Sequence, residues 1–206
     1  MLRPKPVPYL VILLIITLSC LVSTTEAQVT CTPVFTNEYK AYSNVLPTAV
    51  KVLPDGTMLV AGSGLAGTSA NYDGFVAHLN PDGTQIWSFF IGGSGNDAFT
   101  GITPLSDGTT LLYGSTQSFG HPEGKGWLVH IDATGAVLSS FLLGSSTTSN
   151  EQVKAVQQYP DGDIAGTSNV NDGTAASDPV VFKMGLDGTL PRGILRHRER
   201  PMRRTS

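Results

Sequence analysis

The sequence predicts an all-β protein: an incomplete array of about three β-propeller-type blades, each a four-stranded antiparallel sheet. Short apolar runs alternate with breaks rich in Gly, Asp and Asn, and the chain holds 23 glycines. Such runs indicate strands, and no longer stretch has the 3.6-residue apolar period of a helix. Two turn sequences also recur about every 50 residues, a period typical of propellers and solenoids.

The repeat is defined by two landmarks. The first is a nine-residue segment ending in Asp-Gly, which occurs at residues 48–56, 100–108 and 154–162. Its Asp-Gly pairs are 52 and 54 residues apart. A second turn has its glycine at positions 83, 135 and 188, with spacings of 52 and 53. Two landmarks with matched periods indicate one structural unit repeated along the chain.

Each unit is expected to hold four short strands. In the first unit they are predicted at 48–53, 57–62, 74–80 and 84–91, and in the second at 100–105, 109–115, 126–132 and 136–143. Asp-Gly pairs suit the tight turns between them, because glycine accepts a positive φ and aspartate bonds its own backbone. The units are placed at about 45–97, 98–150 and, incompletely, 151–190. Propellers close with about 4–8 blades, so this array would need further blades or chains to close a ring.

Several segments of the first unit resemble the bacterial secreted β-propeller repeat, an SBBP-like family. They are Leu-Pro-Asp-Gly-Thr-Met-Leu-Val-Ala-Gly at 53–62, Asp-Gly-Phe-Val-Ala-His-Leu-Asn-Pro-Asp-Gly at 73–83, Ile-Trp at 86–87 and Gly-Gly-Ser-Gly-Asn-Asp at 92–97. The second unit departs from the pattern, with Ser139 near the place of Trp87 and Gly144 alone for the Gly-Gly pair. The resemblance implies blades on an exported or cell-surface protein, and it implies architecture and location more than activity.

The N-terminus predicts export. Arg3 and Lys5 precede an apolar run at 10–22, and the small residues of Thr25-Glu26-Ala27 fit cleavage before Gln28. Residues 1–27 are therefore interpreted as a signal peptide, with 28–44 as a linker. An uncleaved anchor is the alternative, although a span needs about 20 apolar residues. A second alternative is a lipid on Cys20, which would hold the protein at the outer surface of a membrane. Cleavage would leave Cys31 without a partner in the chain.

Charge divides the remaining chain. Residues 28–190 hold 14 acids and 5 bases, so their net charge is 5 − 14 = −9. This argues against nucleic acid as a partner, because phosphate binding needs clustered Lys and Arg. Residues 191–206 hold six arginines. This Arg-rich tail is interpreted either as a disordered segment that binds an anionic surface or as a truncated or frame-shifted end, since the change falls inside a repeat.

One segment suggests a metal. Gly92-Gly-Ser-Gly-Asn-Asp-Ala-Phe99 matches a calcium-binding nonapeptide, which makes Asn96 and Asp97 candidate calcium ligands. That motif works in tandem copies, and the aligned segment 144–151 has lost it. The glycines are equally expected for a connection between blades. The prediction is therefore that no cofactor is needed, with calcium as the alternative.

No nucleophile elbow, zinc helix or phosphate loop occurs in the sequence. His78 and His130 occupy equivalent repeat positions that Lys183 occupies in the third unit, which indicates a place facing solvent or a blade interface. The prediction is a non-enzymatic exported module that binds a protein or glycan or serves in surface structure, with its contacts in the connections 63–73, 116–125 and 168–178. The alternatives are a calcium- or carbohydrate-binding module and a fragment of a propeller hydrolase or lyase with paired carboxylates.

Overall fold

The structure, a computed structural model, describes residues 44–144, 150–171, 173 and 177–189. In these residues the fold is all-β: eleven strands form three antiparallel sheets, without a helix. The predicted signal peptide, Cys20, Cys31 and the Arg-rich tail lie outside the described residues. Within them, no helix is long and apolar enough to cross a membrane.

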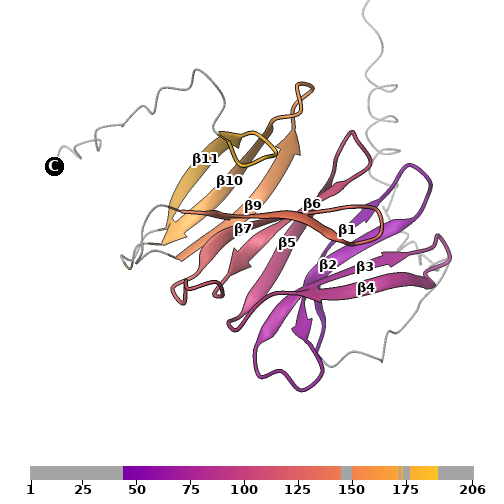
Figure 1. The fold of residues 1–206 in the computed structure, drawn as a ribbon, viewed down its shortest axis with the longest axis horizontal. Helices are drawn as coiled ribbons and strands as arrows, with labels where there is room; N and C mark the ends of the chain where they lie inside the picture. Colours follow the sequence, from indigo (N-terminus) through magenta and orange to yellow (C-terminus); the bar gives the residue numbers. More distant parts are fainter. Residues whose placement is uncertain (1–43, 145–149, 172, 174–176, 190–206) are drawn as a thin grey trace, which may run out of the picture. The chain divides into compact units, whose positions relative to one another are not determined.

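The strands follow one another in space as they do in sequence (Figure 1). The first sheet contains β1 (Leu46–Val52), β2 (Met58–Leu65), β3 (Tyr72–Leu79) and β4 (Gln85–Ile91). The second contains β5 (Asp97–Pro104), β6 (Thr110–Thr116), β7 (Lys125–Ile131) and β8 (Val137–Leu143). The third contains β9 (Asn150–Gln158), β10 (Ile164–Asn171) and β11 (Asp178–Met184). Thus the first two sheets have the four antiparallel strands expected of a blade, and the described part of the third has three.

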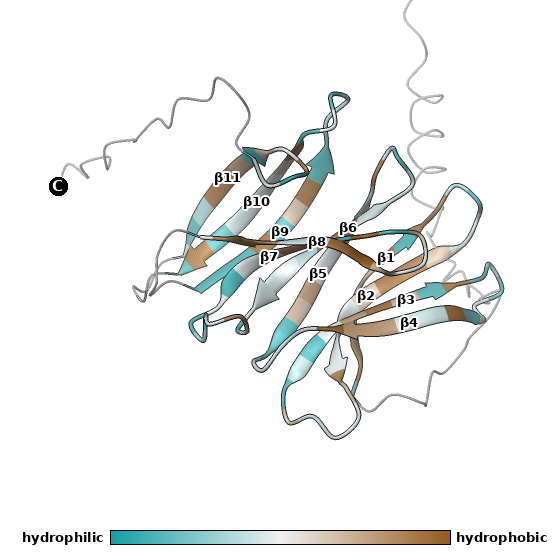
Figure 2. Ribbon diagram, viewed as in Figure 1, coloured by the Kyte–Doolittle hydropathy of each residue, from teal (hydrophilic) through white to brown (hydrophobic). Residues whose placement is uncertain are grey.

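Asp-Gly turns close one end of each sheet. Gly56, Gly108 and Gly162 have φ values of 85°, 85° and 90°, which a residue with a Cβ adopts only at a cost. Asp55 Oδ1 accepts hydrogen bonds from the backbone nitrogen and the hydroxyl of Thr57, at 2.9 and 2.7 Å. The turn residues recognised in the sequence therefore position the hairpins. Figure 2, coloured by hydropathy, shows hydrophobic segments within the strands and hydrophilic segments at several of the turns.

Neighbouring sheets are joined by a repeated hydrogen bond from the first strand of one sheet to the first strand of the next. Thr48 Oγ1 donates to the Phe99 carbonyl at 2.7 Å, and the repeat-equivalent Thr100 Oγ1 donates to the Val153 carbonyl at 2.6 Å. β5 packs over β1, β2 and β3, and β9 packs over β5, β6 and β7. The three blade-like sheets therefore stack by one rule, but they do not form a closed propeller.

The apolar core lies in the spaces between sheets. Between the first and second sheets, Phe99 stacks on Trp127 with ring centroids 4.9 Å apart, and both side chains are fully buried. Between the second and third sheets, Leu111 and Leu128 pack with Val153, Val156 and Ile164. These clusters hold the sheet ends, where the polar residues lie, at fixed distances from one another.

Candidate functional site

Asp97 is the first residue of β5 and lies at the end of the first and second sheets opposite the Asp-Gly turns just described. Its side chain is buried, with 1% of its surface exposed. The carboxylate accepts hydrogen bonds from Thr116 Oγ1 on Oδ1, and from Ser118 Oγ and the Gly93 nitrogen on Oδ2, the last two both at 2.8 Å. Three donors satisfy most of what a buried carboxylate requires. Asp97 therefore holds the β4–β5 connection against the start of the β6–β7 connection.

Asn96 joins the same connections from the solvent side. Its Oδ1 accepts a hydrogen bond from the Tyr72 nitrogen at 3.1 Å, and its Nδ2 donates to Gln117 Oε1 at 3.2 Å. The Gly95 nitrogen donates to Ser118 Oγ at 2.9 Å, and a Cβ on Gly95 would collide with the Gln117 carbonyl. The glycines that suggested a calcium motif are therefore required by the close approach of two connections.

A second carboxylate lies beside Asp97. A Cβ added to Gly92 would collide with both Asp73 Oδ1 and Asp97 Oδ2, so the two acids converge on this glycine. Burial, and then the charge of Asp97, raise the pKa of the Asp73 carboxyl above its ordinary value. We call the group of Asp73, Gly92 and Asp97 the first junction.

The equivalent positions between the second and third sheets are Lys125, Gly144 and Glu151, which we call the second junction. Lys125 and Glu151 are buried, and both side chains approach Gly144, because a Cβ there would lie 3.2 Å from Lys125 Cδ and 2.5 Å from Glu151 Oε2. Ser168 Oγ donates to Glu151 Oε1 at 2.6 Å, and Lys125 Nζ lies 3.3 Å from Glu123 Oε1. The second junction therefore brings a lysine and a glutamate to the same glycine, where the first brings two aspartates.

A shallow pocket of about 340 Å³ opens beside the first junction. Its walls come from the ends of several strands and include Ser63, Tyr72, Asn96, Gln117 and Asn150. Asn96 and Asp97, the two residues predicted as calcium ligands, both line it. Within the described residues, no group of three or more His, Cys, Asp or Glu side chains is arranged to hold a metal ion.

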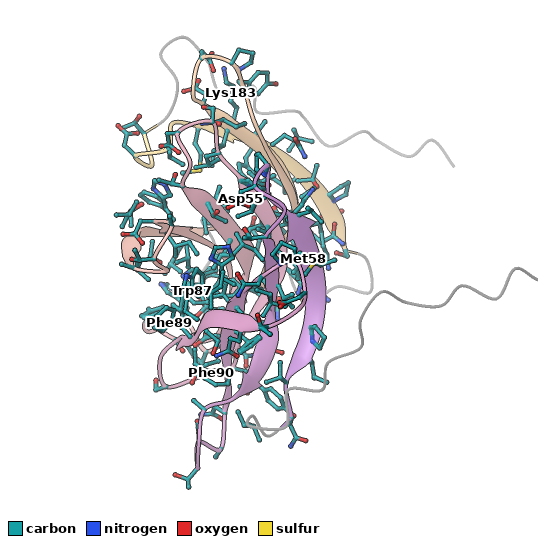
Figure 3. All side chains as sticks on the ribbon, turned by 90° about the vertical axis from the view of Figure 1, so that its right-hand side faces the viewer. Asp55, Met58, Trp87, Phe89, Phe90 and Lys183 are labelled. Carbon is teal, nitrogen blue, oxygen red and sulfur yellow. The ribbon has the colours of Figure 1, made fainter. Side chains whose placement is uncertain are left out.

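A larger groove of about 490 Å³ lies between the first and second sheets at the Asp-Gly end. Its apolar floor includes Leu53, Leu59, Pro104, Leu105 and Ile131. His78 and Trp87 contribute aromatic rings whose centroids are 5.3 Å apart, and Trp87 Nε1 donates to the Ala133 carbonyl at 3.3 Å. We call this the aromatic groove. In Figure 3, Asp55 and Trp87 are labelled on the part of the molecule that forms it.

His78 is held in one orientation by the adjacent turn. The Thr57 hydroxyl donates its proton to Asp55, so it can only accept from His78 Nε2, which lies 2.8 Å away. The second sheet repeats the arrangement, with 2.6 Å between Thr109 Oγ1 and His130 Nε2. In the third sheet Lys183 takes the place of the histidine and lies 2.9 Å from Asp163 Oδ2. The histidine is therefore part of the hairpin in both sheets, and His78 also lines the groove.

Two carboxylates border the aromatic groove. Hydrogen bonds from the Thr57 side chain and then its backbone lower the pKa of Asp55, and a hydrogen bond from the Thr134 side chain is the main cause of the lowered pKa of Asp132. The hydrogen bonds from Thr57 and Thr134 end on Oδ1 of each carboxylate. Both acids are therefore ionised at neutral pH, and each has a second oxygen that these turn hydrogen bonds do not use.

The sequence alone did not indicate this groove. In the sequence, Trp87 stood out only as part of a repeat signature, and Asp55 and Asp132 stood out only as turn residues. One signal was present: the second unit has Ser139 where the first has Trp87, so the tryptophan is not demanded by the blade itself.

No protein-family model matches the sequence, and no curated protein matches it.

Proposed function

We propose that this protein is an exported, non-enzymatic binding module of propeller-type blades, and that the aromatic groove is its binding site. The observation that carries the proposal is the groove itself, a concave apolar space of about 490 Å³ with a tryptophan, a histidine and a few polar groups at its edge. Small-molecule sites typically have this composition and a volume of about 300–1,000 Å³. The sequence of residues 1–27 supports export.

The chemistry of the titratable groups favours binding over catalysis. Asp55, Asp107 and Asp132 bond their own turns, and those bonds lower each pKa, whereas a general acid working near neutral pH needs a raised one. Asp73 has a raised pKa, but the side chain of its neighbour Asp97 has only 1% of its surface exposed and already accepts three hydrogen bonds. A paired-carboxylate hydrolase mechanism therefore finds little support in this part of the chain.

Binding can be tested by NMR, because the two tryptophans report on different places. Trp87 lies in the groove and Trp127 is buried in the core. In a screen of peptides, glycans and small molecules, we expect ligands to shift the indole N–H signal of Trp87 and to leave that of Trp127 unchanged. Trp87→Ser, which copies the second unit, should abolish binding. Ser139→Ala, at the equivalent place in the second sheet, is the matched control.

A different result would refute this assignment. If every ligand found shifts only the connections 63–73 and 116–125, the binding site lies at the opposite end of the sheets. If no ligand shifts Trp87 at any concentration tested, the groove is not a binding site.

Calcium is the second candidate, and the first junction is the observation that favours it. Two carboxylates converge on Gly92, and a divalent cation between them would neutralise their repulsion. An ion that binds the native state raises its stability by mass action. On this reading, millimolar calcium should raise the melting temperature of the native chain but not that of Asp73→Asn. An unchanged melting temperature for the native chain would remove calcium from consideration.

A further inference from the structure

The aromatic groove has an electrostatic character that narrows the choice of ligand. Asp55 and Asp132 both line it, one from the turn after β1 and the other from the turn after β7. The hydrogen bonds to Asp55 keep its side chain fixed beside the groove, and Asp132 is fixed in the same way by Thr134 and Ala136. Two residues from different sheets therefore place negative charge at one opening.

The wall between these acids is aromatic and apolar. The indole of Trp87 is restrained by His78 on one side and by Phe89, whose ring centroid lies 5.4 Å away, on another. Phe89 is labelled next to Trp87 along β4 in Figure 3. A tryptophan ring attracts cations through its negative face, and the attraction grows where water is partly excluded. The floor residues Leu59 and Leu105 are buried apolar side chains, which suit an aliphatic stem.

We propose that the aromatic groove binds an arginine-bearing peptide segment, whose aliphatic stem lies on the apolar floor and whose guanidinium lies between Trp87 and the two carboxylates. Arginine fits better than lysine because its planar group stacks on an aromatic ring and can bond two oxygens at once. The charge of residues 28–190, which is −9, favours approach of a cationic partner. This inference rests on the proposed function, because it names the ligand of the same groove.

The test compares two synthetic peptides that differ in one charge. Acetyl-Leu-Arg-Leu-amide is titrated into the full chain by calorimetry, with acetyl-Leu-citrulline-Leu-amide as its neutral isostere. We expect the arginine peptide to bind about tenfold more tightly, the ratio that one charge-assisted hydrogen bond produces. We expect its affinity to fall as the salt concentration rises.

Variants locate the charge. Asp55→Asn and Asp132→Asn keep the turn-forming Oδ1 but remove the negative charge, and each should weaken the arginine peptide about three- to tenfold and leave the citrulline peptide unchanged. Asp187→Asn is the matched control, because Asp187 forms the same turn with Thr189 in the third sheet and does not line the groove. Its affinity for both peptides should equal that of the native chain.

Three results would overturn the inference, and they separate it from the proposed function. Equal affinities for the two peptides would show that the groove does not distinguish a charged ligand from a neutral one. The proposal that the groove is a binding site would be unaffected. Loss of affinity in Asp187→Asn equal to that in Asp55→Asn would show general attraction to an acidic protein. If the arginine peptide does not bind while neutral ligands still shift the Trp87 signal, the proposal of a cationic ligand is refuted and the proposed function is not. The proposed function itself fails only if no ligand shifts Trp87.

Discussion

The first and second junctions occupy equivalent places between successive sheets, yet their charges differ. At the first, Asp73 and Asp97 converge on Gly92, and burial together with Asp97 raises the pKa of Asp73. At the second, Lys125 and Glu151 converge on Gly144, and both are buried. In each case a glycine follows the last strand of one sheet, and the first strand of the next supplies a buried acid.

The two junctions share a backbone arrangement, a glycine approached by an acid of the next sheet, and differ in the side chain that lies beside that acid. In both junctions the glycine has no Cβ, and this lets a carboxylate from the following sheet approach its backbone closely. The acid is then stabilised in different ways. Asp97 accepts hydrogen bonds from two hydroxyls and a backbone nitrogen, whereas Glu151 accepts one from Ser168 and approaches Gly144 together with Lys125. A junction of two acids is tolerated because Asp73 is only partly buried.

The largest expected effect comes from giving the second junction the charges of the first. Lys125→Asp would place a carboxylate next to buried Glu151 and remove the ion pair with Glu123. A buried charge left without a compensating partner costs about 3–5 kcal/mol, and the buried carboxylate of Glu151 would face a second carboxylate, so the free energy of unfolding should fall by about that amount in urea titrations. The third sheet should be lost first, which hydrogen exchange of β9 and β10 would show.

Lys154→Asp is the matched control, because Lys154 is an exposed lysine on β9. A surface change of this kind should alter stability by less than about 0.5 kcal/mol. If Lys125→Asp is tolerated equally well, the stability of the second junction does not depend on its opposite charges. The difference in charge between the two junctions would then have no effect on stability.

Strand positions could be predicted from the sequence where a turn marks them. The segment predicted at 74–80 is β3 at Tyr72–Leu79, and its far end agrees within one residue because Asp82-Gly83 closes that hairpin. Its near end differs by two residues, since the connection before Tyr72 has no turn pair of this kind. The all-β class followed from the same signals. Four-stranded units are confirmed for the first and second sheets.

The residues of the candidate sites could be predicted together only where they are adjacent in the sequence. Asn96 and Asp97 were recognised together because they are adjacent, within a glycine-rich segment. The two hydroxyl donors to Asp97 come from residues about 20 positions later, and their approach depends on the register that pairs Asp97 with Thr116. The aromatic groove depends on how two sheets pack, since Trp87 of the first faces Ala133 of the second. Nothing in the local sequence of either strand encodes that packing.

The smallest expected effect tests the first junction through its dependence on pH. Because the pKa of Asp73 is raised in the folded state, the native chain loses stability as the pH rises through that pKa, and the loss is complete at neutral pH. Asp73→Asn has no such loss, so it should be more stable than the native chain at pH 7, by about 0.5 kcal/mol after solvent screening. The gain should disappear below the ordinary aspartate pKa of 3.8. Asp107→Asn should have the opposite effect in thermal melts from pH 3 to 7: it should be less stable than the native chain at pH 7. Hydrogen bonds from Thr109 lower the pKa of Asp107, so they stabilise the native chain only where that acid is ionised. A loss of stability in Asp73→Asn at pH 7 would mean that the ionised Asp73 makes a favourable contact, and the two junctions would then share one electrostatic principle.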